Sequence, residues 1–164
     1  AKKLSSMYTL ADILKANCGT LDIRGVAHKG FFASITDFPS YYDANMNLLD
    51  YKAAQELFHD NWPIYTRTND SSPTQYFDTA EVKNSVISNG CQIEGTVENS
   101  VIGRGCVIKK GAVVKNSVVL AEVTVGEGVH VENEVVDKWA RLVHEKEIVS
   151  PADQPGYIRR GDTL

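Results

Sequence analysis

Aliphatic residues return at about every sixth position through the second half of the chain. The series runs Ile87, Ile93, Ile102, Ile108, Val114, Val119, Val125 and Val131. Glycines such as Gly90, Gly105 and Gly128 lie between its members. A spacing near six, grouped in threes, is typical of a parallel β-helix whose triangular coil takes about 18 residues. β-Branched residues dominate and no 3.6-residue period occurs, so the pattern excludes a helix.

A second residue, usually small, follows most of these aliphatic positions after four places. The pairs are Ile87–Cys91, Ile93–Val97, Ile102–Cys106, Ile108–Ala112, Val114–Val118, Val125–Val129 and Val131–Val135. Because a narrow prism has room for one large group at each corner, we expect both members of each pair to face inward. Whether Val119 or Leu120 points inward stays open.

An Asn-x-Val-(Ile/Val) motif is superimposed on this period. Its four copies begin at Asn84, Asn99, Asn116 and Asn133, at steps of 15, 17 and 17 residues. These steps are shorter than three full sixes, so we expect the coils to be shortened at the Asn corner. The strings Gly103-Arg104-Gly105 and Gly126-Glu127-Gly128 precede strands rather than helices, so they indicate corners and not a phosphate loop.

The first half of the chain has a mixed pattern. The predicted elements are a helix from Tyr8 to Ala16 closed by Asn17–Gly19, strands at Leu21–Ala27 and Gly30–Ile35, and helices at Ser40–Leu49 and Tyr51–Phe58. Few elements over so short a stretch cannot make a stable core alone, so we expect residues 1–65 to finish a larger α/β domain. Residues 66–76 are predicted to be a linker and residues 77–164 the β-helix. Since the chain begins at Ala1 without Met, we expect it to be part of a longer protein.

Composition narrows the possible functions. The chain is 43% hydrophobic and 23% charged, and its formal net charge is −4, which argues against a general nucleic-acid binder. No signal-peptide pattern, long apolar run or lipidation motif is present in the sequence, so we expect a cytoplasmic protein with no membrane contact. Cys18, Cys91 and Cys106 lack CxxC spacing. Cys91 and Cys106 fall at equivalent positions one coil apart, where we expect buried free thiols.

Three segments together resemble a known family. They are Tyr42-Asp43-Ala44-Asn45-Met46-Asn47-Leu48-Leu49, Pro63-Ile64-Tyr65-Thr66 and the Asn-Ser-Val-Ile coils. In order and spacing they resemble the C-terminal part of glucose-1-phosphate adenylyltransferase (ADP-glucose pyrophosphorylase). The resemblance implies that the coils form a left-handed β-helix, preceded by the remnant of a nucleotidyltransferase domain, and that they serve regulation and tetramer assembly.

The chain departs from that family at one chemically important position. Catalytic members carry a metal-binding Asp after an aromatic pair, whereas here Ser34 follows Phe31-Phe32-Ala33. A hydroxyl is a much poorer ligand for Mg²⁺ than a carboxylate, and Asp37 lies at an odd offset that reverses its face on a strand. The chain therefore resembles the non-catalytic D-type subunit of bacterial glycogen synthesis. We expect no catalytic residue, metal or cofactor in this chain, and a catalytic adenylyltransferase subunit, which would hold Mg²⁺, as its partner.

The resemblance places effector sites for sugar phosphates or other anions between the β-helix and the catalytic domain. The strongest basic candidates are Lys138, Arg141, Lys146, Arg159 and Arg160, with Arg67, Lys109 and Lys110 as further members. Arg159-Arg160 is the most suggestive pair because arginine binds phosphate bidentately. The alternative is that all are solvated surface charges.

Two further hypotheses concern His130 and the ends of the β-helix. Hexapeptide acyltransferases use a His as general base, which makes an acyltransferase the alternative function, but His130 follows an inward position and should face outward. Tyr76-Phe77 could plug one end of the β-helix. Trp139, with Leu142 and Val143, could cover the other end or meet another subunit. We expect self-association through the β-helix.

Overall fold

The computed structural model of the chain describes residues 9–58, 63–65 and 68–164. Three helices lie in its first part: α1 (Leu10–Asn17), α2 (Phe38–Asn47) and α3 (Tyr51–Leu57). They confirm the three helices predicted from the sequence, with α2 beginning two residues earlier than expected. The predicted start of the first helix, Tyr8, lies outside the described residues.

Fifteen short strands follow, and they form the predicted parallel β-helix. The strands are β1 (Gln75–Tyr76), β2 (Glu81–Lys83), β3 (Val86–Ile87), β4 (Gln92–Ile93), β5 (Thr96–Glu98), β6 (Val101–Ile102), β7 (Val107–Ile108), β8 (Val113–Lys115), β9 (Val118–Val119), β10 (Thr124–Val125), β11 (His130–Glu132), β12 (Glu134–Val136), β13 (Arg141–Leu142), β14 (Glu147–Val149) and β15 (Gly156–Ile158).

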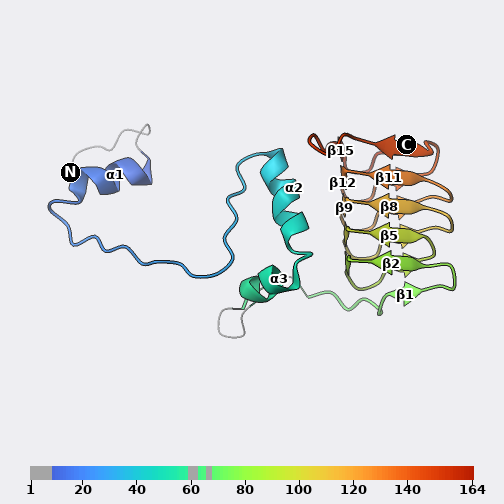
Figure 1. Cartoon of the computed structure of the whole chain (residues 1–164), viewed down its shortest axis with the longest axis horizontal. Helices are drawn as coiled ribbons and strands as arrows, with labels where there is room; N and C mark the ends of the chain where they lie inside the picture. Colours follow the sequence, from blue (N-terminus) through green and yellow to red (C-terminus); the bar gives the residue numbers. More distant parts are fainter. Residues whose placement is uncertain (1–8, 59–62, 66–67) are drawn as a thin grey trace.

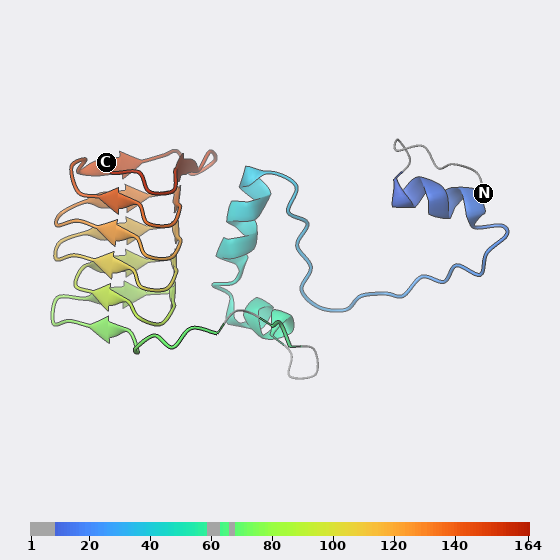
Figure 2. The same cartoon turned by 180° about the vertical axis from the view of Figure 1, so that it is seen from behind.

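The strands build the three sides of a left-handed triangular column (Figures 1 and 2). The first sheet has the order β1-β4-β7-β10-β13, the second β14-β11-β8-β5-β2, and the third β15-β12-β9-β6-β3. Each pairing is parallel and joins strands three apart in the chain, as expected when each coil stacks on the one before. The first strand, Gln75–Tyr76, lies at the end of the segment predicted as a linker.

The register explains the uneven steps between the repeats. Val101 pairs with Val118, a step of 17 residues, because the Asn corner shortens one of three six-residue sides. Val86 pairs with Val101, a step of only 15. The extra shortening lies at the Glu94-Gly95 turn, where two residues separate β4 from β5, and not at the Asn corner alone as predicted. A Cβ on Gly95 would collide with the carbonyl oxygen of Ala112, so this tight turn requires glycine.

The Asn residues of the four repeats make the sharp corners between the second and third sheets. Their φ angles are 45° at Asn84, 46° at Asn99, 44° at Asn116 and 58° at Asn133. Most side chains are strained in this left-handed region, but Asn tolerates it because its short amide can hydrogen-bond locally. The recurring Asn is therefore a backbone requirement of the corner.

The core is a column of aliphatic side chains that runs through the coils. Its largest fully buried members are Ile93, Val97, Ile102, Ile108, Val114, Val119, Val123, Val125, Val129, Val131 and Leu142. Val119 is the inward residue of β9, and Leu120 is partly exposed, which settles the open question from the sequence. Stacking of like residues gives each coil its partners above and below.

Two inward predictions were wrong. Val118 and Val135 are buried but do not belong to the core cluster. They alternate with Val119 and Val136, so on strands with a two-residue period they face the outside of the third sheet. Val118 is nevertheless covered because α2 lies beside β9 (Figure 1).

The cysteines agree with the sequence interpretation. Cys91 and Cys106 are buried free thiols, and Cys18 is free and exposed. The Cys91 thiol donates to the Gly103 carbonyl oxygen at 3.1 Å, and the Cys106 thiol donates to that of Leu120 at 3.0 Å. A hydrogen bond with Cys91 and burial raise the pKa of the Cys106 thiol, so Cys106 stays a neutral packing residue.

The two ends of the column are closed differently. Tyr76 pairs in register with inward-facing Ile93, yet its side chain remains 57% exposed, so it covers the first end only partly. At the other end Leu142 is buried and Leu164 packs against the core. Trp139 is 49% exposed. Leu164, and not Trp139 as predicted, therefore helps to close the C-terminal end.

The strand pair predicted at Leu21–Ala27 and Gly30–Ile35 is wrong. In the described part of the chain, residues 21–37 contain no strand. Val26 and Phe32 are 93% and 79% exposed. A two-stranded ribbon without a third strand or a covering helix buries too little surface to persist, and α1 lies away from this segment (Figure 1).

Candidate functional site

Three of the five basic candidates meet at one corner of the β-helix. Lys138 follows β12, and Arg159 and Arg160 follow β15. Because β12 and β15 are parallel neighbours, the segments after them leave the sheet side by side. The Gly161 backbone N–H donates to the Lys138 carbonyl oxygen at 3.0 Å, which joins the two segments. We call Lys138, Arg159 and Arg160 the basic corner.

Trp139 orients one arginine of this corner. It adopts a left-handed φ of 63°, which turns the chain between β12 and β13. The Arg160 guanidinium lies 4.1 Å from the centre of the Trp139 ring. Such a cation–π contact at an exposed site contributes about 0.5–1 kcal/mol. Stacking uses the face of the guanidinium while bidentate anion binding uses its edge, so the two can occur together.

A carboxylate lies within the basic corner. Asp137 Oδ1 accepts the Lys138 backbone N–H at 2.6 Å, and its Oδ2 accepts the Tyr157 hydroxyl at 2.8 Å. The hydrogen bond from the Lys138 backbone lowers the pKa of Asp137, with smaller contributions from Tyr157 and from the charges of Lys138 and Arg160. An anion at this corner therefore meets cations that already have one negative neighbour.

The corner adjoins the joint between α2 and the β-helix. The Tyr157 ring meets the Phe38 ring of α2 edge-on, with centroids 5.9 Å apart and planes at 73°. Lower on the same sheet, the Tyr42 hydroxyl donates to the Asn116 carbonyl oxygen at 2.5 Å. Figures 1 and 2 show α2 running along the third sheet. Sequence reasoning missed this joint because it pairs residues more than seventy positions apart.

The other basic candidates lie elsewhere. Arg141 is exposed on β13, in the first sheet, and Lys146 lies at the corner before β14, where its Nζ donates to the Glu127 carbonyl oxygen at 2.6 Å. Lys109 Nζ lies 3.3 Å from Glu94 Oε1, and Lys110 is exposed. Arg67 lies outside the described residues. The structure thus separates the candidates into one cluster and several scattered cations.

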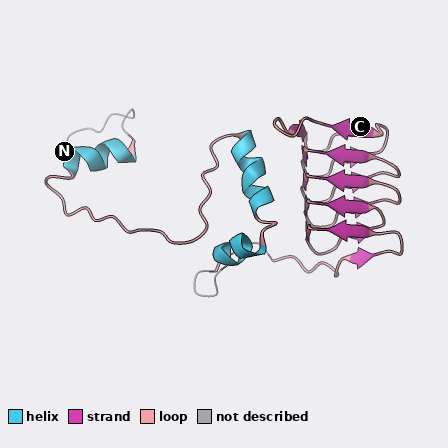
Figure 3. Cartoon of the chain, in the orientation of Figure 1, coloured by secondary structure: helices cyan, strands magenta, loops and turns pink. Residues whose placement is uncertain are grey.

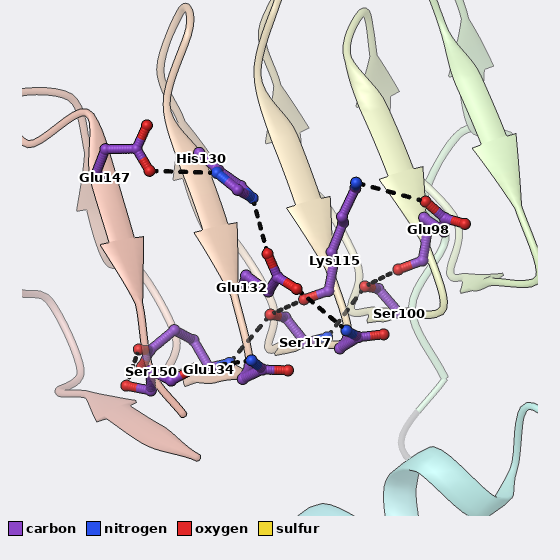
Figure 4. A network of polar contacts seen from close by, with 11 residues as sticks. Glu98, Ser100, Lys115, Ser117, His130, Glu132, Glu134, Glu147 and Ser150 are labelled. Atoms are coloured by element: carbon purple, nitrogen blue, oxygen red, sulfur yellow. Dashed lines mark hydrogen bonds and ion pairs between the residues drawn. The ribbon is translucent and has the colours of Figure 1, made fainter. Parts of the chain in front are cut away.

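The outer face of the second sheet carries a polar network (Figure 4). Lys115 Nζ lies 3.8 Å from Glu98 Oε2 on the neighbouring coil. His130 lies between two carboxylates, with Nδ1 3.3 Å from Glu147 Oε2 and Nε2 3.2 Å from Glu132 Oε2, although the Nε2 contact lacks hydrogen-bond geometry. The outward orientation predicted for His130 is confirmed.

A ladder of buried serines runs beside this network, at the Asn corners. The Ser100 hydroxyl accepts the Ser117 N–H, and the Ser117 hydroxyl accepts the Glu134 N–H, each at 3.1 Å. Glu134 takes the next serine position and is only 4% exposed. Its Oε1 accepts the Ser150 hydroxyl at 2.5 Å, and burial raises the pKa of its carboxyl group.

Room for the larger Glu134 side chain comes from its neighbour. Gly156 pairs with Glu134 in register, and a Cβ there would collide with the carboxylate. The change from Asn-Ser to Asn133-Glu134 is visible in the sequence, but the matching Gly156 becomes evident only from the register.

Ser34 and Asp37 lie near the start of α2. Ser34 is exposed in a segment without helix or strand. Asp37 caps α2: its Oδ1 accepts the Ser40 N–H at 2.9 Å, and hydrogen bonds from Ser40 lower the pKa of its carboxyl group. Within residues 9–58, 63–65 and 68–164, no group of three or more His, Cys, Asp or Glu side chains could hold a metal.

An apolar hollow of about 550 Å³ lies against α2, away from the β-helix joint. Phe31 and Phe32 line it together with Tyr41, Leu48 and Leu57. The hollow shows that the side of α2 opposite the third sheet carries an apolar surface open to a further packing element. Among the described residues, no helix is long and apolar enough to cross a membrane.

Comparison with known proteins gives matches to both parts of the chain. Residues 73–154 match the family described as "GlmU-like, C-terminal hexapeptide". The glycogen biosynthesis protein GlgD of Bacillus subtilis is 31% identical over 153 residues, which cover 93% of this chain and 45% of that protein. A glucose-1-phosphate adenylyltransferase of Fervidobacterium nodosum is 38% identical over 108 residues, 66% of this chain and 26% of that protein.

A second GlgD, from Geobacillus stearothermophilus, is 36% identical over 107 residues, 65% of this chain and 31% of that protein. The chain spans less than half the length of each of these relatives. The match to the Bacillus protein is too long to fit within the β-helix, so it extends through the helical region as well.

Proposed function

The chain belongs to the family with a GlmU-like C-terminal hexapeptide domain, and from this premise we propose that it is the regulatory and assembly part of a glucose-1-phosphate adenylyltransferase subunit. The parent reaction would convert ATP and glucose 1-phosphate into ADP-glucose and pyrophosphate in bacterial glycogen synthesis. The proposed partners are a catalytic subunit of the same class and other copies of the β-helix.

The observation that carries this proposal is the joint between α2 and the β-helix. Hexapeptide coils alone serve several kinds of protein. Here the coils hold a helix of the preceding region through Tyr42 and through the Phe38–Tyr157 contact. Proteins named for glycogen biosynthesis match this chain across both regions, which favours the adenylyltransferase context over an isolated β-helix.

We propose that this chain is itself not catalytic. A Mg²⁺ ion that bridges two phosphates needs oxygen ligands of high charge, and Ser34 offers a neutral hydroxyl where the family resemblance expects a carboxylate. The nearest acidic side chain along the chain, Asp37, is engaged in capping α2. The catalytic ion would then be held by the partner subunit.

A pyrophosphate-release assay tests the absence of catalysis. With ATP, Mg²⁺ and glucose 1-phosphate, the chain alone should release no more pyrophosphate than a buffer blank. Mixed with a catalytic glucose-1-phosphate adenylyltransferase, it should form a complex by native mass spectrometry and change the rate of pyrophosphate release. Turnover by the chain alone contradicts the non-catalytic role, and the absence of any complex contradicts the assembly role.

We further propose that the basic corner binds an anionic effector. Lys138, Arg159 and Arg160 converge there, and Trp139 orients Arg160. A charged hydrogen bond contributes about 1.5–3 kcal/mol, so Arg159→Ala or Arg160→Ala should weaken binding of inorganic pyrophosphate by about 10- to 100-fold in calorimetry. Lys110→Ala, which removes an exposed cation elsewhere, is the matched control. Unchanged affinity in both arginine variants would remove this site.

Acyl transfer is the second candidate, and His130 is the observation that favours it. The ring faces outward and one carboxylate, Glu147, lies near Nδ1, as a base and its orienting group would. If the adenylyltransferase assignment is correct, acetyl-CoA should leave the melting temperature of the chain unchanged. A rise that His130→Ala abolishes would favour the acyltransferase instead.

A further inference from the structure

Tyr157 touches both the basic corner and α2. Its hydroxyl donates to Asp137 Oδ2 at 2.8 Å, and its ring packs edge-on against Phe38 at 5.9 Å. The side chain is 53% exposed, so these two contacts, rather than burial in the core, fix its position. A change in one contact therefore alters the geometry of the other.

The hydroxyl contact lies where an incoming anion would compete. Asp137 holds the Lys138 backbone N–H as well as the Tyr157 hydroxyl, and the charges of Lys138 and Arg160 act on it. A bound anion brings a second negative group to the same cations and donors. Repulsion between the two weakens the hold of Asp137 on Tyr157 because like charges at short range disfavour each other.

The ring contact lies where α2 is held to the β-helix. Phe38 is the first residue of α2, and Tyr42, one turn later, donates to the Asn116 carbonyl oxygen. The opposite side of α2 lines the apolar hollow through Tyr41 and Leu48. Looser seating of the first turn would thus be felt in the region that carries Ser34.

We infer that Tyr157 is a positioning residue that couples anion binding at the basic corner to the seating of α2 on the third sheet. The bound anion draws Asp137 and Tyr157 apart, the Tyr157 ring leaves its edge-on contact with Phe38, and the N-terminal turn of α2 loosens. The inference rests on the proposed effector site, and it adds the direction and the route of the response.

Hydrogen exchange of the whole chain, followed by mass spectrometry, tests the coupling. Saturating inorganic pyrophosphate should speed exchange in the peptide that contains α2 by about 2- to 10-fold, the change expected from one hydrogen bond. Sodium chloride at equal ionic strength should not. The β-helix peptides should keep their rates in both solutions.

Two variants separate coupling from binding. Tyr157→Phe keeps the ring but removes the hydroxyl, so it should bind pyrophosphate with little change while the response of α2 disappears. Arg160→Ala should lose both binding and response. Tyr42→Phe weakens the joint without touching the corner, and it should raise the basal exchange of α2 while preserving the response.

The outcomes distinguish the inference from the proposal beneath it. Calorimetric binding of pyrophosphate by the unaltered chain without faster exchange in α2 overturns the coupling and leaves the effector site standing. A full response in Tyr157→Phe overturns the role of the hydroxyl. No binding of pyrophosphate at all overturns both the effector site and the coupling, while the assembly role is judged separately by complex formation.

Discussion

The β-helix and the region before it treat the same kind of side chain in opposite ways. In the β-helix, Ile102 and Leu142 are fully buried, whereas in the region before it Leu10 and Phe32 are 72% and 79% exposed. Each coil finds its apolar partners in the next coil, only 15 to 17 residues along the chain. The first region has no such repeat. Its stability depends on contacts that its own sequence does not supply.

The two regions meet at α2, which shares properties of both. Its third-sheet side is fixed by Phe38, Tyr42 and buried Ala44, while its other side opens to the hollow. The joint explains how a rigid column could hold and regulate a less self-sufficient neighbour.

The largest effect should come from a cavity in the column. Ile102→Ala removes a fully buried side chain and should destabilise the β-helix by about 2–5 kcal/mol, measured by urea unfolding with circular dichroism. Ile35→Ala, in the first region, is the matched control because its side chain is 58% exposed, and the β-helix should change by less than about 0.5 kcal/mol. Equal losses would show that the two regions unfold as one unit.

A corner substitution should have a smaller effect. Asn99 has a φ of 46°, which a β-branched residue adopts only with strain, so Asn99→Val should cost about 1–3 kcal/mol. Asn99→Gly should cost less, although it also loses the hydrogen bond from Asn84 Nδ2. Gly30→Ala strains a φ of 121° in the first region and should leave the unfolding midpoint of the β-helix unchanged. If Asn99→Gly is as damaging as Asn99→Val, the corner conformation is not the reason for the Asn repeat.

The joint itself should show a local effect. Tyr42→Phe removes the hydrogen bond to the Asn116 carbonyl oxygen, and α2 should open more readily by about 0.5–1.5 kcal/mol in amide exchange. Tyr41→Phe in the same helix is the matched control. Since α2 covers the column from outside, the urea midpoint of the β-helix should stay the same in both variants.

The smallest effect should be the pH dependence of Glu134. Burial raises the pKa of its carboxyl group, so the folded protein holds this proton at pH values where the unfolded chain has released it. Its contribution to stability is therefore complete in acid and is lost as pH rises through the ordinary glutamate value to the raised one. Glu134→Gln should gain stability relative to the unaltered chain at neutral pH and not in acid, in urea titrations at both pH values. A gain confined to acid would contradict the assignment.

The periodic features were predictable because they depend on local spacing. The six-residue period gave the column, its inward aliphatics and the thiol positions of Cys91 and Cys106, and all are confirmed. The Asn repeat correctly located a short corner. A pattern that repeats every coil needs no knowledge of distant segments.

The features that failed depend on distant partners. Val118 and Val135 looked like core residues because they are apolar, but they face outward on the third sheet, and Val118 is covered by α2. The strands at 21–35 are absent because a strand needs neighbours in a sheet. The contacts of Tyr157 with Phe38 and Asp137 were missed since they join residues that only the fold brings together.

Native-state hydrogen exchange along the whole chain tests the contrast between the two regions most directly. The account predicts slow exchange of the backbone amides in coils 92–142, which open only on global unfolding, and nearly unprotected amides in residues 18–36. Peptides from α2 should lie between these limits. Strong protection of residues 18–36 that matches the coils would contradict the account, because it would show that the first region holds its own structure.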